Sequence, residues 1–460
     1  MFLAGSAAFA SNHAEYVGKG PFKTGPDVTK KCLECHSKVA RAFMRTTHWT
    51  LSKEQVVNSK KVILGKNNAI NNFCIALPGN ESRCTSCHAG YGWKDGKFDF
   101  SKPENIDCLV CHDSTGTYKK FPSGAGHPVY EGEKKEFPKG VVWKPVDLVK
   151  VAQGVQPSSR ENCGACHFYG GGGDRVKHGD LDSAMVKPSR DLDVHMGGKS
   201  DMKCQGCHKS TDHKMKGELA STTCGFAAPR QLSCTDCHSE SVHKNVILNK
   251  HAEKVACQTC HIPTFAKVLP TKTWWDWSKA GEDRKVITKD KYGEKTFDKM
   301  KGEFTWEKDV VPQYYWYNGS IERYIAGDKF DPRTVLKLNS PRGDKNDPNA
   351  KIFPFKLMRG KQPYDVGNST IVYAQLFGPP GSDAYWQKFN WELAIASGMR
   401  AAGQPYSGKY GFVETSMIWP VNHMVTPKEK ALKCSECHNE KGGRLNWKAL
   451  GYKGDPMTTK

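Results

Sequence analysis

The chain has 460 residues, 18 cysteines and a formal net charge of +20, and only 38% of its residues are hydrophobic. Such an excess of positive charge is typical of proteins that bind nucleic acid or anionic membranes. The sequence contains no groove-reading module, so we expect no nucleic-acid partner. No stretch beyond the N-terminus is long and apolar enough to cross a bilayer, which predicts no stable membrane insertion.

The chain begins with MFLAGSAAFA, a short apolar run that ends in Ala8-Phe9-Ala10, a sequence similar to a signal-peptidase site. The run lacks the basic segment that opens a complete signal peptide. We interpret residues 1–10 as a signal-peptide remnant, and we expect a soluble periplasmic protein after its cleavage.

Sixteen cysteines lie in eight copies of the pattern Cys-x-x-Cys-His. In this pattern two thiols add to the vinyl groups of one porphyrin and the histidine binds its iron. Zinc sites also use paired cysteines, but they need four ligands and no histidine directly after the second cysteine. We therefore expect eight covalently attached haem c groups. The attachment cysteines are Cys32, Cys35, Cys84, Cys87, Cys108, Cys111, Cys163, Cys166, Cys204, Cys207, Cys234, Cys237, Cys257, Cys260, Cys434 and Cys437. The motif histidines are His36, His88, His112, His167, His208, His238, His261 and His438.

Residues 11–262 carry seven of the motifs. We expect short helices that open at the motifs, joined by loops rich in Gly, Pro, Asp and Asn. With so many haems this segment cannot build an ordinary apolar core, which predicts that porphyrins fill it. The haem propionates would offset most of the positive charge. The irregular gaps between motifs exclude a solenoid.

Residues 263–420 carry no motif but include TWWDW at 273–277 and YYWY at 314–317. We expect a partly stranded excursion that packs on the haem core, followed by helices around 384–402. Residues 421–460 return to the eighth motif. The predicted fold is mainly α with extensive loops and a few short strands, a multihaem cytochrome c fold with a haem-filled core.

The sixth iron ligand decides what each haem can do. A second histidine closes the iron for electron transfer, whereas an open or weakly held position admits substrate. The preferred distal ligands are His48, His178, His195, His213, His243, His251 and His423. His13 and His127 are the doubtful candidates. Seven preferred ligands leave one of eight irons without a histidine, although His127 could fill that position.

Two further features have ordinary explanations. FYGGGGD at 168–174 lacks the Gly-Lys-Ser/Thr ending of a phosphate loop, and its glycines suit a close approach of backbone to a porphyrin. Cys74 and Cys224 lie outside the motifs, and in an oxidising compartment we expect a disulfide between them. A free Cys74 thiol near the haem of Cys84 is the alternative.

The eight motifs, the long motif-free stretch before the last one and the run ENCGACHFYGGGGDRVKHGDLD at 161–182 carry a resemblance. Over essentially the whole mature chain, the sequence resembles the octahaem tetrathionate reductase family. The resemblance implies a periplasmic respiratory reductase for tetrathionate, with nitrite and hydroxylamine also reduced. It implies a lysine amine as distal ligand of the second haem, held here by Cys84, Cys87 and His88. The haem arrangement is similar to that of hydroxylamine oxidoreductase, and calcium near the active haem stays open.

No motif places the ligand lysine. Lys119 and Lys120 follow His112 closely, and Lys144 is the main competitor. We expect His127 to be an acid in the substrate pocket. The ammonia-forming nitrite reductases carry Cys-x-x-Cys-Lys, which is absent from this sequence and excludes a close match to them.

The predicted function is the reduction of tetrathionate to thiosulfate in anaerobic respiration. A small anionic substrate would bind, and a periplasmic or membrane-associated cytochrome would donate electrons. The alternatives are a multihaem electron carrier without a substrate and an enzyme similar to hydroxylamine oxidoreductase.

Overall fold

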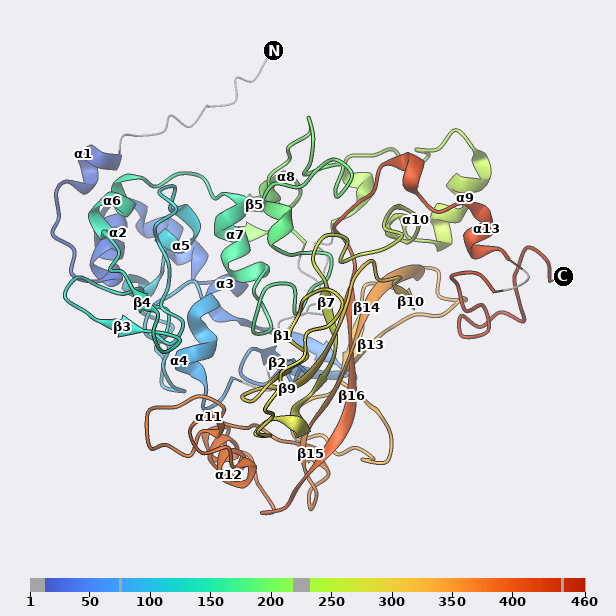
Figure 1. Cartoon of the computed structure of the whole chain (residues 1–460). Coiled ribbons are helices and arrows are strands. Elements are labelled where there is room, and N and C mark those ends of the chain that lie inside the picture. Colours follow the sequence, from blue (N-terminus) through green and yellow to red (C-terminus); the bar gives the residue numbers. More distant parts are fainter. Residues whose placement is uncertain (1–12, 74–76, 218–231, 440–441, 460) are drawn as a thin grey trace, which may run out of the picture. The chain divides into compact units, whose positions relative to one another are not determined.

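The computed structural model describes residues 13–73, 77–217, 232–439 and 442–459, which form two compact units (Figure 1). Unit 1 comprises Met1–Thr50 and Glu81–Ala165, and unit 2 comprises Leu51–Asn80 and Cys166–Lys460. The bounds of these units differ from the predicted segment bounds at residues 262 and 420. Those predicted bounds describe where haem motifs occur along the chain, and they stay a prediction. The predicted signal remnant at 1–10 and the predicted Cys74–Cys224 disulfide lie outside the described residues.

Unit 1 is built on the helix α2 (Gly25–Phe43). The Asp27 carboxylate accepts the backbone N–H of Thr24 at 2.9 Å, which satisfies a donor at the helix start. The helical dihedrals are interrupted at His36, the histidine of the first motif, where φ is −106° and ψ is 24°. The other elements are α1 (His13–Val17), α3 (Thr47–Thr50), α4 (Glu81–Cys84), η1 (Thr85–Cys87), η2 (Pro103–Asn105), α5 (Leu109–His112), β3 (Lys135–Glu136), β4 (Val142–Trp143) and α6 (Leu148–Gln153), and α7 (Arg160–His167) crosses the boundary between the units.

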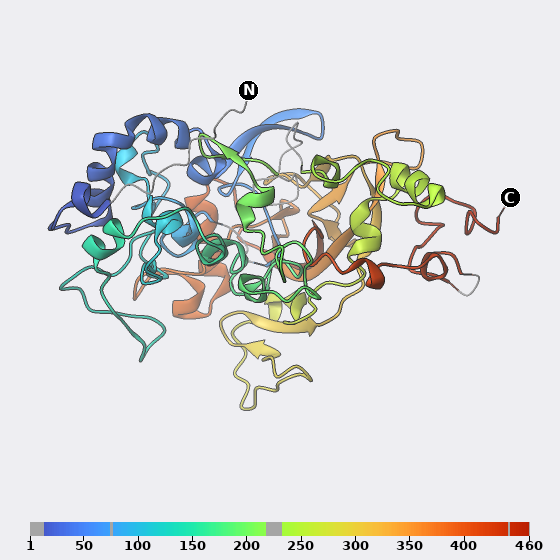
Figure 2. The same cartoon turned by 90° about the horizontal axis from the view of Figure 1, so that it is seen from above.

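An eight-stranded sheet organises unit 2. Its longest strand, β14 (Lys351–Asp365), pairs antiparallel with β16 (Tyr410–Pro420) over eleven positions, and Figure 1 shows these two strands running side by side. The strand β14 also pairs parallel with β7 (Thr271–Asp276) and antiparallel with β10 (Gln313–Tyr317). The sheet order is β12-β16-β14-β7-β9-β8, with β10 and β15 both on β14. In Figure 2 the connection between β7 and β9, drawn in yellow, projects from this sheet.

The remaining elements of unit 2 are short. They are β1 (Ser52–Val57), β2 (Lys60–Gly65), η3 (Ser183–Val186), α8 (Cys204–Cys207), β5 (Ser210–Thr211), β6 (Lys214–Met215), η4 (Cys234–Asp236), α9 (Val246–Lys254), α10 (Cys257–His261), η5 (Trp277–Lys279), β8 (Phe297–Asp298), β9 (Gly302–Glu307), β11 (Ile321–Arg323), β12 (Leu336–Lys337), β13 (Asn339–Pro341), β15 (Thr370–Ile371), α11 (Tyr385–Lys388), α12 (Trp391–Ala401), η6 (Lys428–Lys430) and α13 (Cys434–Cys437).

The expectation of a mainly α chain with a few short strands needs correction. Strands of up to fifteen residues form the largest sheet, and the motif-free segment supplies almost all of it. The reason is the density of β-branched and aromatic residues in that segment, which pack well on a pleated surface. The prediction of helices around 384–402 is confirmed by α11 and α12.

Tryptophans of both aromatic clusters are buried inside unit 2. Trp275 and Trp277 are buried with ring centroids 4.9 Å apart, and both belong to the main hydrophobic core. Trp316, from the second cluster, is buried and donates its Nε1–H to the carbonyl of Leu450 at 2.9 Å. These indoles therefore form part of the interior of the unit.

The helix α12 packs one apolar face against the main hydrophobic core. Trp391, Ala394, Ile395, Gly398 and Met399 recur with helical spacing, and all five are buried. The side chain of Asn390 accepts the N–H of Leu393 at 3.1 Å and caps the helix. The helix therefore presents one apolar stripe to the core.

Among the described residues no helix is both long enough and apolar enough to cross a membrane.

We predict that Ile395→Ala, at a fully buried position, lowers the free energy of unfolding by about 2–5 kcal/mol because it leaves a cavity. Leu393→Ala on the same helix is the control, since Leu393 is 37% exposed and should cost less than about 1 kcal/mol. Guanidinium titration of the two purified holoproteins checks the difference. Equal midpoints for both variants would contradict the core assignment.

Candidate active site

Each Cys-x-x-Cys-His motif lies on a helical turn, as the sequence predicts. At His88 the amide donates to the carbonyl of Thr85 at 2.8 Å, whereas in four other motifs the histidine amide closes the turn by donating to the carbonyl of the first cysteine. This bond measures 3.1 Å at His112, 2.8 Å at His208, 2.9 Å at His238 and 2.8 Å at His438. The i to i+4 contact brings both thiols and the imidazole to one side of the turn, the arrangement that covalent attachment and iron ligation require.

Five motif imidazoles face a second imidazole. The ring centroids are separated by 6.0 to 6.4 Å in the pairs His13–His36, His195–His238, His208–His423, His243–His261 and His251–His438. Two iron–nitrogen bonds of about 2 Å plus the two ring radii give a separation on the order of 6 Å. The residues therefore fit a haem iron between the two rings of each pair.

Four of the predicted distal ligands, His195, His243, His251 and His423, lie in such pairs. His13, which sequence reasoning set aside because it follows the predicted cleavage site, also lies in one. In the structure His13 is the first residue of α1. The ligand roles stay predictions for the whole set.

The three other preferred histidines have different surroundings. His48 lies on α3, and His213 lies in the turn between β5 and β6 with a φ of +64°. His178 is packed against Trp419 with a centroid separation of 5.6 Å. Burial, with the charge of Lys177, lowers the pKa of His178 well below its usual value, so its imidazole is neutral, the form that binds metal.

The segment around the fifth and sixth motifs also fits porphyrins. Among the described residues 201–217 and 232–255, none is buried. Val246 and Ile247 on α9 are 77% and 61% exposed in the polypeptide. A porphyrin presents large apolar faces that suit such side chains. Within the described part of the chain, no three His, Cys, Asp or Glu side chains are grouped to hold a metal ion without haem.

The glycine run at 168–174 does not form a phosphate loop. Gly171 has a φ of +84°, and a Cβ there would lie 2.8 Å from the ring of Phe73. The glycine is required by its left-handed backbone and by this close packing. Its predicted approach to a porphyrin stays a prediction.

A buried polar cluster lies beside the second and third motifs, within unit 1. Its centre is Asp107, which directly precedes Cys108 and is 2% exposed. One carboxylate oxygen accepts the hydroxyl of Tyr91 at 2.8 Å and the amide of Val110 at 3.0 Å. The other accepts the hydroxyl of Tyr118 at 2.9 Å. This cluster was missed from the sequence because its members are far apart along the chain.

Lys120 completes the coordination of this carboxylate. Its ammonium lies 3.0 Å from Asp107 Oδ2, 2.5 Å from the carbonyl of His88 and 3.3 Å from the carbonyl of Gly90. The side chain is 6% exposed. Three acceptors surround the three ammonium protons, which is the condition for keeping a charged lysine buried.

The three candidate lysines are thus separated by their surroundings. Lys119 and Lys144 are exposed to solvent, whereas Lys120 lies against the backbone of His88. The imidazole of His88 is 1% exposed, and aromatic rings surround it. Its neighbours are Trp49, Trp93, Phe98 and Phe100, with centroid separations of 5.0 to 6.1 Å.

His127 lies next to the same cluster. Its ring stacks on Tyr91 with centroids 5.4 Å apart, and its Nδ1 is 2.7 Å from the hydroxyl of Tyr130. Burial lowers the pKa of His127 to about 4, helped by the charges of Lys120 and Lys135. The imidazole is therefore neutral at pH 7. Burial next to Asp107 also raises the pKa of Tyr91 well above its usual value.

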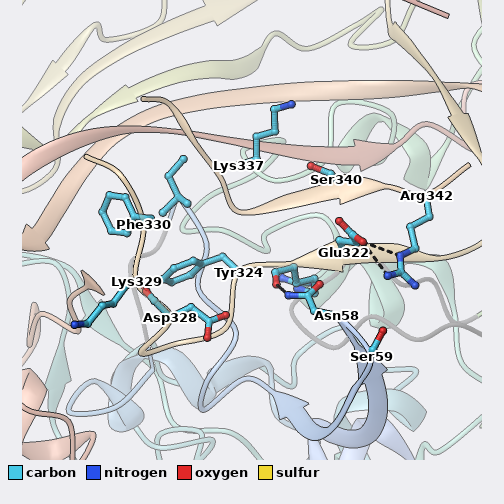
Figure 3. Close-up of a pocket in the computed structure, with 12 residues that line it drawn as sticks. Asn58, Ser59, Glu322, Tyr324, Asp328, Lys329, Phe330, Lys337, Ser340 and Arg342 are labelled. Carbon is cyan, nitrogen blue, oxygen red and sulfur yellow. Dashed lines mark hydrogen bonds and ion pairs between the residues drawn. The ribbon is translucent and has the colours of Figure 1, made fainter. Parts of the chain in front are cut away.

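A pocket lies within unit 2 (Figure 3). It is lined by side chains that include Tyr324, Lys329 and Phe330, and Figure 3 shows the ion pair of Arg342 and Glu322 at its edge, 2.8 Å long. No residue of a haem motif lines it. Its charges of both signs and its distance in sequence from every motif give it no part in the candidate site.

Comparisons with known proteins agree with this geometry. Residues 272–441 match the family model described as Cytochrome c bacterial, and residues 31–113 match the one described as Cytochrome c554 and c-prime. The crystal structure of octaheme cytochrome c from Shewanella oneidensis is 48% identical to this chain, covers 98% of each chain and superposes with a TM-score of 0.89. An uncharacterized protein from Archaeoglobus fulgidus is 25% identical over 223 residues, which are 40% of this chain and 74% of that protein.

Helical turns that present two thiols and an imidazole, together with these matches, define a multihaem c-type cytochrome with covalently bound haem c. At this identity and coverage the chain belongs to the family of octahaem c-type cytochromes. Its function is accordingly in electron transfer or redox chemistry.

The pKa of His127 gives a prediction about pH. Between about pH 6.5 and pH 4 the unfolded chain binds a proton at this histidine that the folded chain does not, so folding stability falls as the pH falls. The full shift corresponds to at most about 3 kcal/mol. In His127→Gln, the loss of stability across this window should be smaller than in the wild type by a few kcal/mol at most. Denaturant titrations at pH 7.0 and 4.5 measure it, and equal losses in both proteins would contradict the buried neutral imidazole.

Proposed function

We propose that this cytochrome reduces small sulfur and nitrogen compounds, first tetrathionate to thiosulfate, at the haem held by Cys84, Cys87 and His88. In this proposal Lys120 supplies the amine on the distal side of that haem. The observation that carries the proposal is the burial of Lys120 beside the second motif, with its ammonium 2.5 Å from the carbonyl of His88. Because this carbonyl belongs to the motif histidine, the amine would have to leave it to reach the opposite face of the haem. Nitrite and hydroxylamine are the proposed additional substrates.

The surroundings of Lys120 support its assignment over the other two lysines. A lysine that reaches an iron must have its stem packed inside the protein, and only Lys120 among the three is buried. Iron ligation requires the neutral amine, so the ammonium has to pass a proton to its surroundings. The Asp107 carboxylate at 3.0 Å is placed to take this proton or to keep the lysine charged and off the iron.

A charged Lys120 also suits an anionic substrate. Tetrathionate and nitrite are anions, and a buried ammonium attracts them more strongly than an exposed one because water screens it less. When bound, the haem would supply the iron that the substrate meets and the electrons that reduce it. The paired imidazoles would belong to the haems that carry electrons to this site.

His127 is the proposed proton relay. A neutral imidazole can accept a proton at one nitrogen while it gives up the proton on the other. Its Nδ1 contacts the hydroxyl of Tyr130 at 2.7 Å, which provides a path away from the cluster. Reduction of nitrite to ammonium consumes protons, whereas the two-electron cleavage of tetrathionate into two thiosulfates consumes none. The relay is therefore needed for only one of the two reactions.

We further propose export to the periplasm, where a donor cytochrome delivers the electrons. A non-catalytic electron carrier is the rival function, favoured by the five imidazole pairs that the structure contains. The two functions differ in whether one haem accepts an external ligand.

The first test compares three lysine variants in reduced-viologen assays with tetrathionate. Lys120→Gln keeps a hydrogen-bond donor for Asp107 but has no basic amine, so turnover should fall at least tenfold. Lys119→Ala and Lys144→Ala, at exposed positions, should retain activity within a factor of two. Haem content and the absorption spectrum of each variant confirm folding. Full activity in Lys120→Gln would reject its assignment.

The second test uses His127→Gln with two substrates. Nitrite reduction should fall at least tenfold, while tetrathionate reduction should change by less than a factor of three, because only the first reaction requires protons. Parallel losses with both substrates would show that His127 acts on substrate binding or on the structure and not on proton supply.

The third test separates enzyme from electron carrier. Cyanide or nitrite added to the oxidised holoprotein should perturb the spectrum of one haem in eight in the wild type, and this response should be altered in Lys120→Gln. A spectrum that does not respond at all would favour the electron carrier.

A further inference from the structure

Two of the paired imidazoles have a carboxylate behind them. The first is His423, which faces the motif histidine His208 at a centroid separation of 6.3 Å. The Nδ1 of His423 lies 3.2 Å from Oδ2 of Asp180. The same oxygen accepts the backbone amides of Asn422 and His423 at 2.8 and 3.0 Å, and Asp180 is 3% exposed. These bonds fix the carboxylate against the ring.

The second is His438, a motif histidine that faces His251 at 6.1 Å. Its Nδ1 lies 2.6 Å from Oδ1 of Asp455. Asp455 is 9% exposed and also accepts the amide of Met457 at 2.9 Å. The C-terminal segment thus folds back on its haem motif to place one carboxylate.

The partners define the tautomer of both rings. A carboxylate oxygen only accepts, so Nδ1 of each histidine carries the proton and Nε2 is left for the iron. Such a partner raises the electron-donating power of the ligand more than a neutral acceptor does.

Other ligand histidines have neutral partners. The Nδ1 of His208 faces the carbonyl of Lys216 at 2.9 Å, and that of His251 faces the carbonyl of Ile247 at 2.8 Å. Within the described residues, the buried Nδ1 of His243 has no hydrogen-bond partner. Carboxylate contacts are thus found at the pairs His208–His423 and His251–His438, in contrast to the Nδ1 of His243.

We infer that Asp180 and Asp455 set the potentials of two haems, and that the haems at the pairs His208–His423 and His251–His438 are the low-potential members of the set. The inference rests on the haem ligation proposed above and is independent of the substrate. A hydrogen-bonded anion behind the imidazole stabilises the ferric over the ferrous state, because it makes the ring a stronger donor and adds a nearby negative charge. The haem of His243 and His261 should lie at higher potential.

Asp455→Asn and Asp180→Asn test this in the complete holoprotein. Asparagine keeps an accepting oxygen and removes the charge. In a spectroelectrochemical titration, each variant should move one of the lowest transitions upward by about tenfold in its reduction equilibrium, which is about 59 mV for one electron. Asp331→Asn, at a carboxylate paired with Arg333 on the surface, is the control and should titrate as the wild type. Asp455→Glu restores the charge and should return the transition toward its original position.

The variant His423→Met tests the haem ligation separately from the effect of the carboxylates on the reduction potentials. If the proposed ligation is correct, this variant loses one low-spin bis-histidine signal in the electron paramagnetic resonance spectrum. An unchanged spectrum would overturn the ligation itself. A lost signal together with unshifted potentials in both asparagine variants would overturn the role of the carboxylates and leave the ligation intact. If the Asp180→Asn variant does not bind its haem, the potentials of Asp455→Asn alone decide the role of the carboxylates. The two carboxylates contact ligands of different haems.

Discussion

The constraint on which the rest of this protein depends is the separation of paired imidazoles, which fits a haem iron between the two rings. Five histidine pairs lie at 6.0 to 6.4 Å, and every pair joins a motif histidine to a histidine outside the motifs. The motif histidine is fixed by its own helical turn, so the chain must fold to deliver the second ring. The loops of the haem-binding segments are shaped by this requirement more than by burial, since residues 201–217 and 232–255 bury no side chain among those described.

At the second motif the cationic group beside the motif histidine is a lysine. Lys120 and Asp107 form a buried ion pair with all three ammonium protons accepted. Removing one member of such a pair costs about 3–5 kcal/mol, because the other charge stays buried without its partner. A lysine at this position is therefore an expensive residue for a structural role that an apolar side chain could fill. Under the proposed assignment, the part that Lys120 plays at the haem of His88 offsets this cost.

The attachment sites could be predicted from the sequence because the chemistry of Cys-x-x-Cys-His is local: five consecutive residues contain it entirely. The distal histidines are harder to predict, because each lies outside the motif whose iron it would bind. Counting predicted His195, His243, His251 and His423, which the structure places opposite motif imidazoles, whereas the place of His13 in the sequence made it a doubtful candidate. The cluster around Asp107 could not be found, since Tyr91, Tyr118 and Lys120 meet it only in the folded unit. The sequence analysis predicts only a few short strands, because it rests on the many haem motifs. The eight-stranded sheet is built instead from the motif-free aromatic segment.

Three buried aspartates show how one side chain serves different purposes beside a haem motif. Asp107 lies against a lysine, and there the carboxylate stabilises the charged form of a group that has to become neutral before it can bind iron. Asp180 and Asp455 lie against imidazoles that bind as neutral rings, and there the same carboxylate strengthens the ligand. A carboxylate thus opposes ligation by an amine and favours ligation by an imidazole. Under the proposed assignments, this difference alone is enough to keep one iron accessible to substrate while others stay closed for electron transfer.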